Sequence, residues 1–202
     1  MGDKVFINLL LGKYRFPRVE ERIFMFLDLK DSTKHAESLG HHQFSRLIQD
    51  CFHDLTKSAI ECEVEIYHYV GDEVILTWEV EKGLYNNNCI QLFFAFTKQL
   101  DERQNYYKKN YNIVPEFKAG VNMGAVTVAE IGYIKRDIAY LSDVLNTAES
   151  IQKKCNELQE QLLISSIVKD KLNEEPAFFF RNYGAQEFKG KSQLVEVFAV
   201  NI

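Results

Sequence analysis

The segment YHYVGDEVIL, residues 67–76, places an acidic pair directly behind a glycine and between two apolar runs. From Val64 to Val70, three of the four alternate side chains are apolar and the fourth is His68, which is the period of a β-strand. Gly71 and Asp72 are typical turn residues, and the run from Glu73 to Val80 returns as a second strand. The segment therefore predicts a β-hairpin that carries an aspartate at its turn.

A second aspartate ends another predicted strand. RIFMFLDL, residues 22–29, is a short apolar run bounded by charge, and it predicts a buried strand that ends at Asp28. In the following KDST, Ser32 or Thr33 can cap a helix that runs to Gly40. A second helix is predicted after Gly40, where apolar side chains recur every three or four residues as Phe44, Leu47, Ile48, Cys51, Phe52 and Leu55.

The rest of the chain alternates between predicted helices and strands. A long helix spans about residues 88–107, and FKAGVNMGAVTVAEIG gives two strands hinged at Met123–Gly124. A helix in DVLNTAESIQKKC, a short strand LLIS and a helix ending before Pro176 follow. Two last strands, in FFFRNYG and LVEVFAV, flank FKGK.

This order predicts an α+β fold. Its core is a ferredoxin-like βαββαβ sheet with helices on one face, extended by extra C-terminal strands and helices. We expect residues 1–21, which are charged and contain Pro17, to form a lead-in without a packed element. Residues 22–202 are then the folded domain.

Composition excludes several classes of protein. The length of 202 residues and a 46% hydrophobic content suit one globular domain, and a net charge of -5 gives no electrostatic footprint for nucleic acid. The four cysteines have no CxxC spacing, no secretory signal is present, and no apolar run approaches the roughly 20 residues of a membrane span. We expect a soluble, cytoplasmic protein with reduced thiols.

The two aspartates point to metal chemistry when they are taken together. In a βαββαβ sheet the first strand lies beside the hairpin, so Asp28 and Asp72 can face one point at the sheet edge. Paired carboxylates suit Mg²⁺ or Mn²⁺, and the start of the helix after KDST can receive phosphate oxygens. For either aspartate alone, a solvated residue at a strand end is the competing interpretation.

Five segments in this order resemble the class III nucleotidyl cyclases, the catalytic domains of adenylyl and guanylyl cyclases. They are FLDLKDST, YVGDEV, FKAGVNMGAVTVAEIG, SDVLNTAESIQ and FKGK, and the resemblance covers roughly Arg22 to Val200. It implies a head-to-tail homodimer with active sites at the interface. The lead-in is also similar to a linker that follows a membrane domain in some bacterial cyclases, so we expect the chain to be a fragment of such a protein.

The resemblance also implies roles for single residues. Asp28 and Asp72 of one chain would bind two Mg²⁺ or Mn²⁺ ions, and Asn146 and Lys191 would be catalytic residues from the other chain. The 3′-hydroxyl of a nucleoside triphosphate, activated on a metal, would attack the α-phosphorus and release pyrophosphate. The residues expected to contact phosphate are Lys30, Asp31, Ser32, Thr33 and Lys118.

Some of these assignments have competing interpretations. Lys118 falls where some relatives carry an arginine, and a solvated strand lysine is its alternative reading. Lys191 is otherwise a surface lysine, with Lys189 as its substitute.

The chain departs from the family pattern behind the asparagine. Ser150 stands where an arginine is usual, four residues after Asn146, and Arg136 or Lys153 are the candidates to replace that cation. Ser142 stands where a glycine is usual before the helix.

The expected base pocket also departs from the pattern. His68 and Ala139 match neither the adenine nor the guanine selectors of the family, and Tyr67, Tyr69 and Tyr140 are close in sequence. The combination resembles the bacterial pyrimidine cyclases of phage defence and slightly favours UTP or CTP. An ATP cyclase with unusual selectors, a degenerate domain that only dimerises or binds nucleotide, and ordinary strand packing of His68 and the tyrosines stay open.

Overall fold

A computed structural model describes residues 13–134, 136–188 and 194–202 of the chain. The strands are β1 (Arg18–Leu29), β2 (Glu65–Val70), β3 (Glu73–Glu79), β4 (Phe117–Ile131), β5 (Asp137–Leu141), β6 (Leu162–Ser165), β7 (Phe179–Gln186) and β8 (Val195–Asn201). The helices are α2 (Ser32–Glu61), α3 (Val80–Leu84), the short 3-10 helix η1 (Tyr85–Asn87), α4 (Asn88–Glu102), α5 (Gln104–Tyr111), α6 (Asp143–Leu158) and α7 (Ser166–Lys169).

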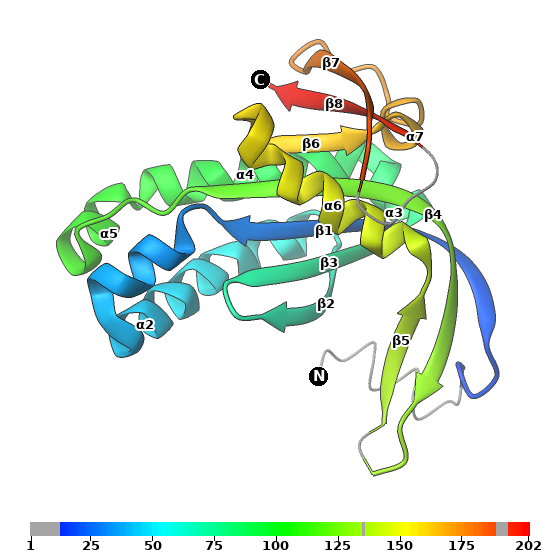
Figure 1. Ribbon diagram of the computed structural model, residues 1–202, viewed down its shortest axis with the longest axis horizontal. Coiled ribbons are helices and arrows are strands. Elements are labelled where there is room, and N and C mark those ends of the chain that lie inside the picture. Colours follow the sequence, from blue (N-terminus) through cyan, green and yellow to red (C-terminus); the bar gives the residue numbers. More distant parts are fainter. Residues whose placement is uncertain (1–12, 135, 189–193) are drawn as a thin grey trace.

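One mixed sheet organises the molecule (Figure 1). Its strand order is β2-β3-β1-β4-β6-β8-β7, and β5 pairs with β4 outside this path. β1 therefore lies beside the hairpin strand β3, as predicted, and it is antiparallel to both β3 and β4. The predicted α+β fold with a ferredoxin-like core is confirmed.

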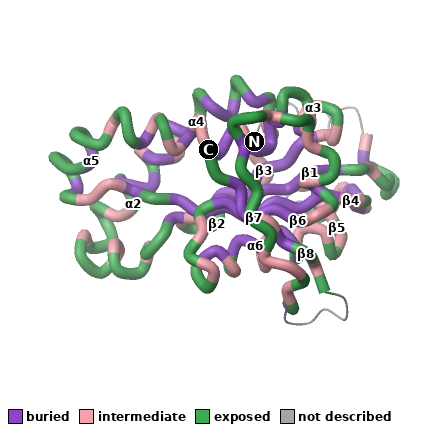
Figure 2. The backbone as a smooth tube through the Cα atoms, turned by 90° about the horizontal axis from the view of Figure 1, so that it is seen from above, coloured by how far each residue is buried: buried purple, intermediate pink, exposed green. Residues whose placement is uncertain are grey.

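The two faces of the sheet bury different sets of side chains, and the central strands are largely buried (Figure 2). Ile23, Met25 and Leu27 of β1 pack with apolar side chains of α2 and α4. Phe24 and Phe26 point to the opposite face, which α6 covers. The core helices α2 and α4 thus lie on one face, as predicted, and α6, which follows an added strand, covers the other face.

Several predicted boundaries were wrong. β4 is a single strand, since Met123 and Gly124 both pair with β1 and the ladder runs through the predicted hinge. The chain turns back after Ile131 instead, and β5 is the return strand. The part of β4 beyond Gly124, together with β5, projects from the sheet and is called the β4–β5 arm below (Figure 1).

The helices also differ in detail from the prediction. The break at Gly40 is confirmed, because this residue is non-helical inside α2 with φ of 73°. The predicted helix over residues 88–107 is divided at Arg103, whose side chain forms an ion pair with Asp54 of α2. The helix predicted before Pro176 is α7, which ends at Lys169, and Asn173 beyond it is held by hydrogen bonds with Asn87 and with the carbonyl of Leu84.

The segment expected to be an unpacked lead-in contributes to the fold. β1 begins at Arg18, and Tyr14 is buried among the apolar side chains on the α6 face. Its hydroxyl donates to Glu20 at 2.9 Å, which explains why this charged stretch can be ordered. In the described part of the chain, the helices are too short or too polar to cross a bilayer.

The close approach of α6 to β4 depends on Gly120. A Cβ at this position would lie 2.2 Å from the backbone nitrogen of Gln152 and 2.5 Å from the carbonyl oxygen of Ala148. Both are main-chain atoms of α6 and cannot rotate away. The glycine therefore sets the distance between the helix and the centre of the sheet.

We expect Gly120→Ala to destabilise the protein by about 3 kcal/mol or more, because the overpacked atoms are backbone. For a domain of this size the melting temperature falls by ~6 °C or more. Gly40→Ala is the control: its Cβ would meet nothing within 4 Å, and only the strain of a positive φ remains, about 1–2 kcal/mol. Equal losses in the two variants, measured by thermal unfolding, would contradict this account of the packing.

Candidate active site

Asp28 and Asp72 meet at one end of the central strands. Asp28 is near the end of β1, in register with Glu73 of β3, and Asp72 directly precedes Glu73 in the turn. Gly71 adopts a positive φ of 64°, which the tight turn requires. Burial raises the pKa of Asp28, Lys118 opposes this shift, and the nearby Asp72 carboxyl adds to it. The juxtaposition expected from the sequence is therefore present.

Two donors hold the same oxygen of Asp28. The Lys118 ammonium lies 3.1 Å from Oδ2, and the side-chain amide of Gln152 donates to Oδ2 at 3.0 Å. Lys118 is only 9% exposed and also donates to the side-chain oxygen of Asn156 at 3.1 Å. The alternative reading of Lys118 as a solvated strand lysine is wrong. Gln152 was not identified from the sequence as a site residue, because the helical periodicity of its segment indicates only that this position is buried.

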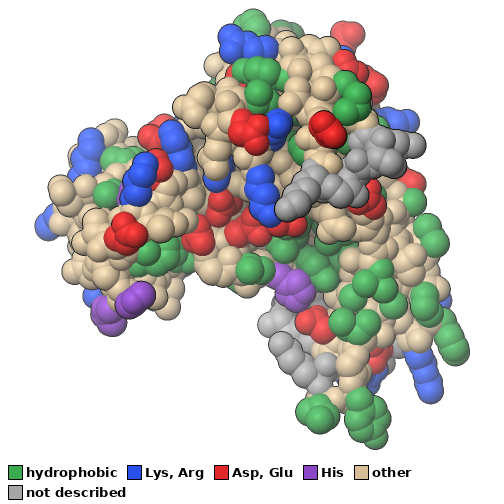
Figure 3. Space-filling model, viewed as in Figure 1, with side chains coloured by type: hydrophobic (Ala, Val, Ile, Leu, Met, Phe, Trp, Pro, Cys, Tyr) green, Lys and Arg blue, Asp and Glu red, His purple; other side chains and the backbone are tan. Residues whose placement is uncertain are grey.

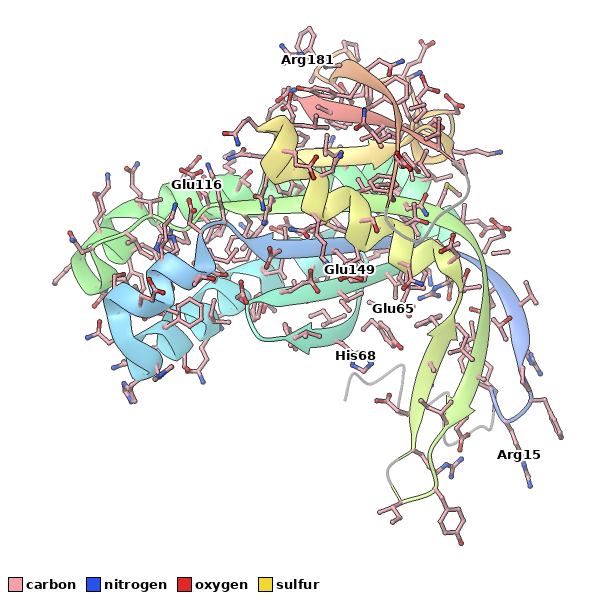
Figure 4. The ribbon with its side chains drawn as sticks, in the orientation of Figure 1. Arg15, Glu65, His68, Glu116, Glu149 and Arg181 are labelled. Carbon is pink, nitrogen blue, oxygen red and sulfur yellow. The ribbon has the colours of Figure 1, made fainter. Side chains whose placement is uncertain are left out.

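Further acidic side chains surround this pair. Burial, followed by the charges of Asp28 and Glu149, raises the pKa of Glu73 to about 7. Acidic side chains gather in the hollow below α6 (Figure 3), and Figure 4 shows Glu149 on α6 above it. Repelling carboxylates at one point fit a divalent cation. The described residues contain no group of three or more His, Cys, Asp or Glu side chains arranged to hold a metal. Asp28 and Asp72 would therefore need ligands from substrate or water.

The loop after β1 differs from the predicted cap. Asp31, not Ser32 or Thr33, is the N-cap of α2, and it adopts a left-handed conformation with φ of 55°. Its carboxylate pairs with Lys34 at 2.6 Å and makes no capping hydrogen bond. Ser32 and Thr33 lie in the first turn of α2, where backbone N–H groups lack partners within the helix.

Lys30 is turned toward β4 in this structure. Its ammonium lies 2.9 Å from the Glu116 carboxylate, and both side chains are exposed. Glu116 is at the opposite end of the β4 region from the arm (Figure 4).

The residues expected to form a base pocket are partly brought together. The rings of Tyr67 and His68 lie 4.0 Å apart between centroids, and the Tyr67 ring contacts that of Tyr140 at 4.9 Å. Tyr69 lies on the opposite face, against Phe52 of α2. The reason is a bulge in the pairing of β2 with β3 between Ile66 and His68, which puts Tyr67 and His68 on the same face. Ala139 is buried in β5, next to Tyr140.

An ion pair that the sequence did not reveal lies beside these aromatic rings. Arg22 of β1 is 2% exposed, and its guanidinium donates to Glu65 at 2.8 Å and to the Thr77 hydroxyl at 3.3 Å. It also lies over the Tyr140 ring, 5.2 Å from the centroid. Figure 4 shows Glu65 and His68 in the same region below α6. In the sequence, Arg22 is only the charged residue at the start of an apolar run, so its buried ion pair could not be foreseen.

Asn146 is exposed on α6, and the next turn of the helix contains Ser150. The Ser150 hydroxyl donates to the Asn146 carbonyl at 2.7 Å, so it is engaged within the helix and does not reach outward. Lys153 forms an ion pair with Glu149 on α6, and Arg136 forms one with Glu130 on the β4–β5 arm.

Ser142 has a structural role, because its hydroxyl accepts from the Val144 amide at 3.2 Å and caps α6. Lys189 and Lys191 lie outside the described residues.

A cavity of about 480 Å³ lies elsewhere, at the edge of the sheet formed by β7 and β8. Gln159, Glu160, Phe179, Phe180, Arg181 and Asn201 line it. Figure 4 shows Arg181 far from Glu149 and His68. The cavity is therefore separate from the carboxylates.

A central βαββαβ sheet with paired aspartates at the end of its first strand and hairpin is compatible with a nucleotidyl cyclase domain. Residues 15–201 match the model of the adenylate and guanylate cyclase catalytic domain, and the chain belongs to this family.

Adenylate cyclase 2 of Rhizobium meliloti (strain 1021) is 32% identical over 202 residues, which are 99% of this chain and 55% of the relative. The chain thus spans about half the length of this curated relative. A bacterial light-regulated adenylyl cyclase superposes with a TM-score of 0.84 at 20% identity, over 100% of this chain and 58% of the other. The adenylyl cyclase CyaB from P. aeruginosa gives 0.79 at 20% identity, over 93% and 96%.

Asp72→Asn is expected to stabilise the metal-free protein slightly, because it removes a negative charge that opposes ionisation of Asp28. We expect the melting temperature in EDTA to rise by ~2–4 °C, and the further rise that Mn²⁺ causes in the wild type to disappear. Thermal unfolding with and without Mn²⁺ measures both effects. A variant that keeps the full Mn²⁺-dependent rise would show that Asp72 does not bind the metal.

Proposed function

We propose that this domain converts a nucleoside triphosphate, with ATP as the first candidate, into a 3′,5′-cyclic nucleotide and pyrophosphate. The observation that supports this most directly is the meeting of Asp28 and Asp72 beside Lys118, in a chain of the cyclase family. We place the activity in the cytoplasm, where nucleoside triphosphates are available. A membrane domain before residue 1 stays a prediction.

The residues present fit two Mg²⁺ or Mn²⁺ ions, because Asp28 and Asp72 are adjacent carboxylates whose repulsion a cation relieves. When bound, such ions neutralise phosphate charge and make the 3′-hydroxyl more acidic. Lys118 is placed to exchange its ion pair with Asp28 for a phosphate oxygen, since its ammonium is already at this point. Lys30 and the backbone N–H groups of Ser32 and Thr33 are the other phosphate donors that we assign.

The two halves of each site come from different chains in this proposal. Gln152 contacts Asp28, and Asn146 lies six residues earlier on α6, about 9 Å along the helix axis. Because Asn146 is exposed and distant from the Asp28 of its own chain, it is free to serve the site of a partner. Lys191 would act from the same side, outside the described residues.

The β4–β5 arm supports a homodimer. Its outer end exposes several large apolar side chains (Figure 3). They are Ile131, Tyr133 and Ile134, of which Tyr133 is 97% exposed. Such a patch on a projecting element favours burial against another chain. A head-to-tail arrangement would then pair the acidic end of one domain with Asn146 of the other.

Lys153 is the better candidate to replace the missing arginine. Asn146, Ser150 and Lys153 are spaced four and three residues apart, so they share one side of α6. The pair between Lys153 and Glu149 is largely exposed, 68% for the lysine, and costs little to break. Arg136 is engaged with Glu130 on the arm.

Mixing variants tests the shared site. Asp72→Ala and Asn146→Ala are each expected to be inactive as homodimers, because every site lacks one required group. After mixing and re-equilibration, half of the dimers are mixed and each contains one complete site, so about a quarter of the wild-type activity should return. Pyrophosphate release measures the result. No recovery, with mixed dimers demonstrated by a tag exchange, would refute divided sites.

The base of the nucleoside triphosphate is proposed from the named relative and from the residues around His68. The whole-length relative is named an adenylate cyclase, which supports ATP, and the pyrimidine preference expected from His68 and Ala139 has no support from the comparisons. Tyr67, His68 and Tyr140 provide aromatic surface and one imidazole that can donate or accept on the α6 face. These groups are proposed to contact the base.

We expect ATP to have the highest kcat/KM of the four triphosphates with Mn²⁺, with the cyclic product identified by mass. His68→Ala should lower this value about tenfold and reduce the preference over GTP, UTP and CTP, since a hydrogen-bonding group is lost. Tyr69→Ala is the control, because Tyr69 lies on the other face. A higher kcat/KM for UTP or CTP would exclude the ATP assignment.

A nucleotide-binding regulator is the second candidate function, and Ser150 in place of an arginine favours it. Binding of all four triphosphates without pyrophosphate release, in a protein whose Mn²⁺ binding needs Asp72, would support this alternative.

A further inference from the structure

Gln152 is a buried polar residue to which neither the sequence pattern nor the proposed reaction assigns a role. It is 2% exposed, and its neighbours Ile151 and Cys155 pack in an apolar cluster with β6 and β8. An apolar side chain would fill this position without the cost of burying an amide. The described structure gives its amide nitrogen one side-chain partner, Oδ2 of Asp28, at 3.0 Å.

The position of this amide is rigidly set. At Gly120 the backbone of Gln152 lies so close to β4 that even a methyl group would not fit. Lys118, two residues before Gly120 on the same strand, binds the same Oδ2 at 3.1 Å. Two donors on one oxygen fix the rotation of a carboxylate, and both are anchored to the contact between α6 and β4.

We propose that Gln152 is a positioning residue for Asp28, which holds the carboxylate in the orientation that binds the divalent cation. This inference rests on the proposed function. In the proposed dimer, α6 would orient Asp28 for one site through Gln152, while it presents Asn146 to the other site.

The first test is metal affinity without turnover. Gln152→Met keeps the volume and removes the donor, and we expect the Kd for Mn²⁺ alone, from the electron paramagnetic resonance signal of free Mn²⁺, to rise 10–100-fold. Gln49→Met, on an exposed position of α2, is the matched control and should leave the Kd unchanged. If Gln152→Met does not fold, Gln152→Asn tests the same loss, because its amide is one methylene too short to reach Asp28. An unchanged Kd in the folded variant overturns the proposal.

The second test separates positioning of Asp28 from a distortion of α6. When Gln152→Met is mixed with Asn146→Ala, activity should return. In the mixed dimer both defects fall in the same site, so the other site is complete. When Gln152→Met is mixed with Asp72→Ala, the activity should stay at the residual level of Gln152→Met. Each site of the mixed dimer then has one defect, and in both sites the defect is at the Asp28 and Asp72 side. The reverse pattern would show that the substitution acts through Asn146 of its own helix and would overturn the proposal.

Failure of the proposed function remains distinguishable from failure of this inference. If the reference mixture of Asp72→Ala with Asn146→Ala regains nothing, the shared site is wrong, and the Mn²⁺ Kd alone decides the role of Gln152. If the reference mixture recovers and the Kd is unchanged, the shared site stands and the positioning role is wrong.

Discussion

The contact between α6 and β4 at Gly120 brings the side chain of Gln152 to the Asp28 carboxylate, on which the proposed metal site depends. Because the helix backbone touches the sheet, Gln152 reaches Asp28 across 124 residues of sequence, and Lys118 is confined between Asp28 and Asn156. A larger residue at position 120 would lift the helix, and the Gln152 amide would no longer meet Oδ2 of Asp28. The close packing at Gly120 therefore determines whether the Gln152 amide reaches the Asp28 carboxylate.

The face of the sheet beneath α6 is divided along its strands into regions of different chemistry. At one end Asp28, Glu73 and Lys118 are in register across three strands. Phe24, Phe26 and Ile75 fill the middle. Further along lies the ion pair of Arg22 and Glu65, covered by the Tyr140 ring. A second chain packed antiparallel on this face would bring its Arg22 end to the Asp28 end of the first chain, which is the physical basis of the proposed head-to-tail dimer.

Two of the buried cations on this face are held by different means. Burial disfavours the charge of Arg22, and Glu65 together with the face of Tyr140 compensates for it. Lys118 has Asp28 and Asn156 as partners, both at the end where a substrate phosphate is proposed to bind. The arginine is thus enclosed by its own chain, whereas the lysine can exchange its partner. This difference is why only Lys118 is assigned to phosphate.

Local patterns in the sequence were sufficient for the strands around Asp28 and Asp72, the break at Gly40 and the helical position of Asn146. These features depend on periodicity and turn chemistry within a few residues. Tertiary structure alone decided which residues surround Asp28, because hydrogen bonds from Gln152 and Lys118 join segments that are remote in sequence. It also decided the face of Tyr69, since a bulge between Ile66 and His68 shifts every later side chain of β2 to the other side of the sheet. Such a shift depends on pairing with β3, and alternation within β2 cannot reveal it.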